Sequence, residues 1–169
     1  MEDAVVQPPV TFVFLSRVIK QTRRAQNTVD CLLEWCADHQ IEFDETDMVF
    51  LESAFELQPE EGEFEQVIAS QLHASYERLQ TIIASMLETP VDPESRVFLL
   101  NVAAVSWHCM SSNSQLPQKV IFGFAALKLF REASQVPLPP QSPVWLHLVL
   151  DHMLLLEEMG DRAPALLLG

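Results

Sequence analysis

Hydrophobic residues recur at helical spacing along most of this chain. The segment from Glu63 to Glu88 shows the pattern most clearly, because its mostly apolar seam alternates steps of four and three residues. Such spacing places the seam on one face of a helix that packs against other helices. The seam consists of Ile68, Leu72, Ser75, Leu79, Ile82 and Met86.

Six segments carry patterns of this kind between prolines and short polar residues. The clearest start signals are Asp92-Pro93-Glu94 and Ser142-Pro143, where a capping side chain precedes a proline at the first helical position. The predicted helices are about Val10–Asp38, a helix capped by Asp44 or Thr46 that ends near Leu57, Glu63–Glu88, 93–112, 117–134 and 143–160.

The fourth segment differs from the others because it is apolar nearly all round. Eleven of the fourteen residues from Val97 to Met110 are apolar or cysteine. A helix without a broad polar face must be surrounded by other helices. We therefore predict an all-α fold, a single compact bundle of six or seven helices around a buried central helix at about 93–112. One domain covers residues 1–169, with flexible or loosely docked ends at 1–9 and 161–169.

Three local features qualify this prediction. Val10–Phe14 alone has the composition of a strand, but no partner strand is evident. Gln26–Thr28 are weaker helix formers, so the first helix has a potential break there. In the fifth helix, Gly123 and Ala126 lie on one face and would let a neighbouring helix approach closely.

Composition agrees with a globular domain. The chain has 169 residues, 49% of them hydrophobic, and only four glycines. Its acidic amino terminus does not resemble a secretory signal, and its apolar runs are too short for a membrane span. We expect a soluble, cytoplasmic protein that does not bind membranes. Cys31, Cys36 and Cys109 form no paired framework, so we expect reduced thiols.

The distribution of charge is the feature most informative about function. None of the ten Lys and Arg residues lies between positions 25 and 77. That interval holds fourteen acids, whereas the rest of the chain holds ten acids and ten bases. The net charge of −14 is therefore concentrated in one third of the chain. The acids are Asp30, Glu34, Asp38, Glu42, Asp44, Glu45, Asp47, Glu52, Glu56, Glu60, Glu61, Glu63, Glu65 and Glu77.

A concentration of like charge opposes folding, so it is either a solvated surface or a docking surface. The leading hypothesis is a non-enzymatic interaction module that binds, and inhibits or chaperones, a basic protein through this acidic face, as an immunity protein does. The predicted partner-binding residues are Glu42, Asp44, Glu45, Asp47, Glu52, Glu56, Glu60, Glu61, Glu63 and Glu65, together with Phe43 and Phe50.

The only basic cluster consists of Arg17, Lys20, Arg23 and Arg24. A pI near 4.5 argues against direct nucleic-acid binding through it. We expect these bases to pair with the protein's own acids or with an acidic partner.

Catalytic and metal-binding patterns are weak. His147 and Asp151 are one turn apart, as are His73 and Glu77, but such pairs are more often structural. Asn101 and His108 are seven residues apart on the central helix, so they lie almost in line. Because buried polar groups need partners, we expect hydrogen bonds to a neighbouring helix, and the alternative is that they line a small pocket with Ala104. We predict no cofactor and no metal.

Two alternative functions are kept open. A helical bundle with an apolar groove would bind an amphipathic partner helix or a second copy of itself, so self-association is left open. A helical enzyme or small-ligand-binding domain would use His108, His147 or His152.

Overall fold

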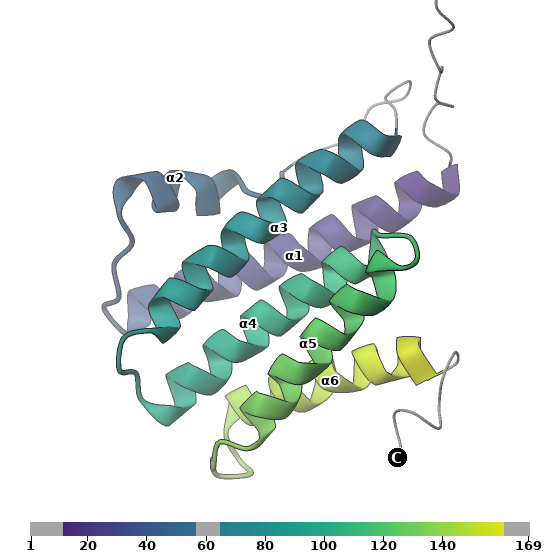
Figure 1. Cartoon of the computed structure of the whole chain (residues 1–169). Helices are drawn as coiled ribbons and strands as arrows, with labels where there is room; N and C mark the ends of the chain where they lie inside the picture. Colours follow the sequence, from purple (N-terminus) through teal and green to yellow (C-terminus); the bar gives the residue numbers. More distant parts are fainter. Residues whose placement is uncertain (1–11, 57–64, 161–169) are drawn as a thin grey trace, which may run out of the picture.

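The computed structural model describes residues 12–56 and 65–160 of the chain, which contain six α-helices and no strand (Figure 1). The predicted all-α bundle is therefore confirmed. The ends predicted to be flexible, 1–9 and 161–169, lie outside the described residues. The helices are α1 (Phe12–Asp38), α2 (Glu45–Ser53), α3 (Glu65–Leu87), α4 (Pro93–Ser112), α5 (Gln118–Ser134) and α6 (Pro143–Gly160).

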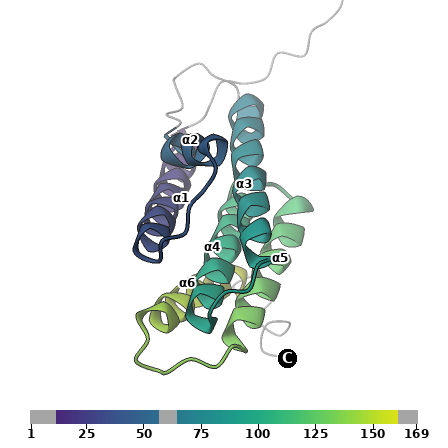
Figure 2. The same cartoon turned by 90° about the vertical axis from the view of Figure 1, so that its left-hand side faces the viewer.

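Helix α4 occupies the centre of the bundle. Four other helices, α1, α3, α5 and α6, all pack against it (Figures 1 and 2). From Leu99 to Ser112 every residue is buried except Trp107, which is half-buried. This confirms the central helix predicted from the apolar run, because each side of α4 faces another helix.

Helix starts follow the capping signals in two of three cases. The Asp92 carboxylate accepts a hydrogen bond from the Ser95 backbone N–H at 3.0 Å, and Pro93 is the first residue of α4. Asp44, and not Thr46, caps α2, because its carboxylate accepts from the Asp47 N–H at 2.7 Å. At α6 the predicted cap is absent, since the hydroxyl of Ser142 forms no hydrogen bond with a described residue.

Helix α1 is continuous through Gln26–Thr28, so the potential break does not occur. The Thr28 hydroxyl donates to the Arg24 carbonyl at 2.9 Å, within the helix. Ala25 and Val29 on either side are buried in the core and hold this stretch in place. The strand considered for 10–14 is wrong where the structure describes it, because residues 12–14 begin α1.

Helix α2 ends at Ser53, earlier than predicted. The chain turns there, and Phe55 is buried with its ring centroid 4.8 Å from that of Tyr76 on α3. The apolar pattern therefore continues beyond the helix, because Phe55 belongs to the core without being part of α2.

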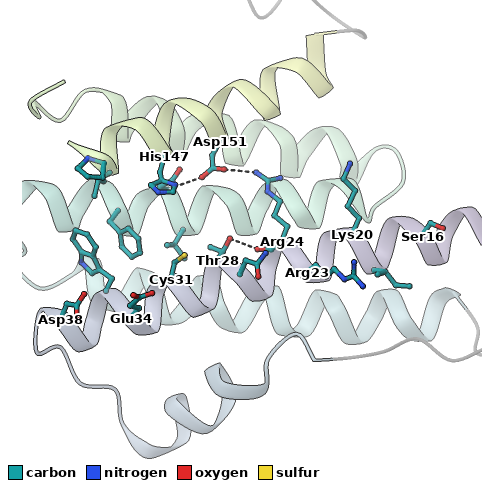
Figure 3. A pocket seen from close by; sticks show the side chains of 18 residues that line it. Ser16, Lys20, Arg23, Arg24, Thr28, Cys31, Glu34, Asp38, His147 and Asp151 are labelled. Carbon is teal, nitrogen blue, oxygen red and sulfur yellow. Dashed lines mark hydrogen bonds and ion pairs between the residues drawn. The ribbon is translucent and has the colours of Figure 1, made fainter. Parts of the chain in front are cut away.

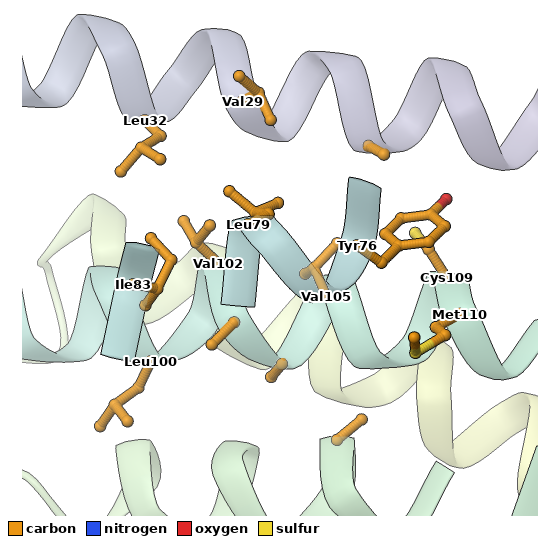
Figure 4. Packing of buried hydrophobic residues seen from close by; sticks show 14 of the residues in the cluster. Val29, Leu32, Tyr76, Leu79, Ile83, Leu100, Val102, Val105, Cys109 and Met110 are labelled. Atoms are coloured by element: carbon orange, nitrogen blue, oxygen red, sulfur yellow. The ribbon is translucent and has the colours of Figure 1, made fainter. Parts of the chain in front are cut away.

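The core lies between α4 and the helices around it. Val29 and Leu32 of α1 point toward Leu79 and Ile83 of α3 and toward Val102 of α4 (Figure 4). Burying side chains of this size contributes about 1.5–3 kcal/mol each, before the entropy of ordering the chain is subtracted.

Helices α4, α5 and α6 meet closely at Gly123, which is buried together with Ala126. A methyl group on Gly123 would lie 3.4 Å from Ser111 Oγ of α4 and 3.5 Å from the Met159 sulfur of α6. Helix α5 therefore makes its close approach through small residues, as their shared face predicted.

Replacing Gly123 by Leu should lower the free energy of unfolding by about 1–3 kcal/mol, because the larger side chain must push α4 and α6 away. Gly123→Ala is the matched control. Its methyl group makes ordinary contacts, and alanine favours a helix by up to about 1 kcal/mol, so its stability should equal or exceed that of the parent. Urea unfolding followed by circular dichroism measures both. A Leu variant as stable as the parent would show that the contact is loose.

Candidate functional site

A groove of about 880 Å³ runs between α1 and α6, with α4 as its floor (Figure 3). The two wall helices run in opposite directions along it. Its apolar floor includes Phe98 and Val102 of α4 and Val144 of α6. The Trp35 ring of α1 stacks on Phe98, with their centroids 4.5 Å apart. The groove is therefore apolar at its base, and α1 and α6 form its two walls.

The middle of the groove is crossed by a polar contact between its two walls. Arg24 of α1 approaches Asp151 of α6, with Nη2 and Oδ1 3.6 Å apart. Asn101 of α4 donates its amide N–H to Asp151 Oδ2 at 2.9 Å. Arg24 also donates from Nη1 to His108 Nδ1 at 2.9 Å. Arg24 thus connects α1 to both α4 and α6.

A second polar contact holds α6 against α4 further along. His108 is 2% exposed, and its Nε2 lies 2.6 Å from Glu158 Oε2. Because arginine can only donate, Nδ1 of His108 must accept from Arg24, and Nε2 carries the proton that it donates to Glu158. Ser112 donates its hydroxyl to Glu158 Oε1 at 3.1 Å, and Lys119 Nζ lies 3.8 Å from the same oxygen.

These contacts decide the charge state of Glu158. Burial raises the pKa of the Glu158 carboxyl, but its interactions with His108, Ser112 and Lys119 outweigh burial and lower the pKa from 4.5 to about 2. The ionised carboxylate is therefore part of the folded structure. We call Arg24, His108, Glu158, Asn101 and Asp151 the polar clamp, because together they join α1, α4 and α6.

The polar clamp contains several residues that the sequence analysis singled out. Asn101 and His108 each form a hydrogen bond with α6, which confirms the expectation that these polar residues of the central helix find partners on a neighbouring helix. Asp151 and Glu158 are also seven residues apart, and this matching spacing was the signal that sequence reasoning missed. Two pairs in the same register mean that α4 and α6 run in the same direction. Among the four bases of the cluster, only Arg24 forms an ion pair with an acid of the described residues.

The remaining histidines have separate environments. His147 is exposed and lines the groove, whereas the Asp151 carboxylate next to it contacts Arg24 and Asn101. His152 stacks on Phe130, with centroids 5.2 Å apart, and its pKa is lowered by burial and by Arg131. His73 bonds with Ser114 Oγ at 3.2 Å. His108, His147 and His152, the three histidines considered for a catalytic or ligand site, therefore lie in three different environments.

The three cysteines are unpaired, as expected, and two of them are buried. Burial raises the pKa of Cys36 and Cys109 to about 11, so both remain neutral thiols. Cys31 is exposed and lines the groove. Its pKa is raised by burial and by the neighbouring charges of Glu34, Asp30 and Asp151.

The predicted acidic residues lie mainly on α2 and the loop before it. Four of them are exposed and form no ion pair with a described residue: Glu42, Glu45, Glu52 and Glu56. Asp44 caps α2, and Asp47 lies 3.8 Å from the guanidinium of Arg78 on α3. Glu65 begins α3, whereas Glu60, Glu61 and Glu63 lie outside the described residues.

The two predicted aromatic contacts are only half-exposed. Phe43 and Phe50 pack against the core, and Arg78 covers the Phe50 ring with its guanidinium 4.5 Å from the centroid. These rings therefore support the attachment of α2 more than they offer a free surface.

Comparison with known proteins found no matching protein-family model, no matching curated protein and no matching solved structure. Within residues 12–56 and 65–160, no helix is long and apolar enough to cross a membrane. Over the same residues, no three His, Cys, Asp or Glu side chains gather as a metal site would require. The groove between α1 and α6 is therefore a candidate binding site that is identified from the structure alone.

Replacing Glu158 by Gln should lower the free energy of unfolding at pH 6 by about 2 kcal/mol, because a charged hydrogen-bond acceptor is lost. The folded-state pKa is below the ordinary value of 4.5, so the carboxylate stabilises fully above pH 4.5. That stabilisation is lost as the pH falls toward about 2. The difference between the two proteins should therefore shrink from pH 4.5 downward, which urea unfolding at several pH values measures.

Glu157→Gln is the matched control for this measurement, because the adjacent Glu157 is exposed and forms no ion pair with a described residue. Its stability should follow that of the parent at every pH. A Glu158→Gln effect that stays constant between pH 6 and pH 3 would contradict the lowered pKa.

Proposed function

We propose that this protein is a non-enzymatic interaction module that holds an amphipathic helix of a partner protein in the groove between α1 and α6. One observation carries the proposal: the groove combines an apolar floor with charged and polar rims on two helices. An amphipathic helix has the complementary arrangement, because its apolar stripe faces the floor and its polar face remains in solvent.

The outer face of α6 extends the apolar surface beyond the groove. Leu146, Leu150 and Leu154 are each about half exposed and follow one another at intervals of four residues. This row lies beside His147 and Asp151, which line the groove. Exposed leucines in a continuous row are typical of an interaction surface, so they support a partner that touches the rim of α6 as well as the floor.

The polar clamp supports the proposal in another way. It fixes the spacing of the walls through hydrogen bonds and an ion pair, so the groove exists before a partner arrives. A site formed in advance loses less conformational entropy on binding than one that must first be ordered.

A second candidate function is the binding of a basic protein by the acidic surface. It is favoured by the four exposed acids Glu42, Glu45, Glu52 and Glu56, which no described base neutralises. Charges of this kind would raise the rate of association with a cationic partner and would do so less at high salt.

Selection of helical peptides from a displayed library against the immobilised protein should yield sequences with apolar residues at positions i, i+3, i+4 and i+7. Their binding should be blocked by Asn27→Trp, which places an indole at the exposed rim of the groove. Ala84→Trp, at an exposed position of α3, is the control and should leave binding unchanged. A fluorophore on the exposed thiol of Cys31 should report the same binding.

The same selection distinguishes the second candidate. Uniformly basic peptides would favour the acidic surface if their binding is lost with combined Gln replacements at Glu42, Glu45, Glu52 and Glu56. Peptides insensitive to Asn27→Trp would contradict the groove as the binding site.

A further inference from the structure

The charged side chains of α1 are separated along the helix. Its first half carries bases and no acid, and its second half carries acids and no base. In the groove, Lys20 and Arg23 lie at one end, and Glu34 and Asp38 lie at the other (Figure 3). These four side chains form no ion pair with a described residue.

This order of charges does not stabilise α1 itself. The helix dipole favours acids near the amino end and bases near the carboxyl end, which is the reverse of what α1 has. Neighbours one turn apart carry the same charge, as in Lys20 with Arg24 and in Glu34 with Asp38, and such pairs repel. The separation therefore has no explanation in the stability of this helix.

We propose that the groove selects a partner helix whose charges are separated, with acids at one end and bases at the other. The partner's acids would lie over Lys20 and Arg23, and its bases over Glu34 and Asp38. This inference rests on the proposed function and specifies the chemistry of the partner helix.

The same charges determine the direction of the partner. A helix with acids near its amino end and bases near its carboxyl end is favoured by its own dipole. To match the groove, such a helix must place its amino end over Lys20 and Arg23. It therefore lies parallel to α1 and antiparallel to α6.

The basic end and the acidic end of the groove interact with a bound helix independently of each other. Lys20 and Asp38 are eighteen residues apart on α1, which corresponds to about 27 Å along the helix axis. This exceeds the screening length of about 8 Å at physiological salt. A uniformly acidic or uniformly basic helix would therefore be attracted at one end and repelled at the other, so the groove discriminates by the separation of charge.

Two stapled peptides of about 18 residues test the inference, because that length spans the groove. Both carry the same leucine stripe and the same composition. One has Glu in its first two turns and Lys in its last two, and the other has Glu and Lys alternating at the same positions. Anisotropy at low salt should show the Glu-first peptide binding about tenfold more tightly, and the difference should fade near 1 M salt, where the screening length is about 3 Å.

The neutral variant Lys20→Gln, Arg23→Gln, Glu34→Gln and Asp38→Asn should abolish this preference. All four positions are exposed, and circular dichroism checks that the helices are retained. The matched control, Glu77→Gln, Glu88→Gln, Lys128→Gln and Arg131→Gln, removes four exposed charges outside the groove and should leave the preference unchanged. Loss of the preference in the neutral variant alone also excludes a difference in helicity between the peptides as its cause.

The outcomes separate this inference from the proposed function. If both peptides bind equally and Asn27→Trp blocks both, the groove binds helices but the selection by charge separation is wrong. If the neutral variant keeps the original preference, the selection is also wrong. If neither peptide binds, or if Asn27→Trp has no effect, the proposed function fails and this inference fails with it.

Discussion

The burial of α4 on every side is the constraint on which the rest of the structure depends. A helix with no face for water needs a complete shell, and α1, α3, α5 and α6 supply it. The shell must also satisfy the few polar groups that α4 carries inward, because an unpaired buried polar group costs about 1–3 kcal/mol. His108 meets this requirement through Arg24 and Glu158, whereas Asn101 donates to Asp151 but its side-chain oxygen accepts no hydrogen bond from a described residue.

The groove results from the way in which α1 and α6 pack around α4. Arg24 connects α1 to α4 and α6 through polar contacts, and the two wall helices do not pack tightly against each other along their lengths. A polar link holds its partners at a defined separation, whereas apolar side chains interdigitate and bring helices together. The same interaction that completes the core therefore leaves an open site whose floor is Phe98 and Val102.

The order of the charged residues along α1 is not explained by the stability of the helix. Like-charged neighbours one turn apart destabilise a helix by about 0.2–0.5 kcal/mol per pair. In α1 such pairs are Lys20 with Arg24 and Glu34 with Asp38, and the core beneath them supplies the stability that tolerates them. Side chains that oppose folding and line an open groove are more readily explained by recognition than by structure.

The sequence by itself determined the helices, the central position of α4 and the close approach at Gly123, because periodicity, caps and small residues act locally. It also indicated that Asn101 and His108 would find partners on other helices. Only the tertiary structure decided that those partners are Asp151 and Glu158, and that Arg24 reaches His108 across 84 positions of sequence. The physical reason is that hydrogen bonds and grooves depend on which helix faces come together, and a pattern along one chain does not specify that pairing.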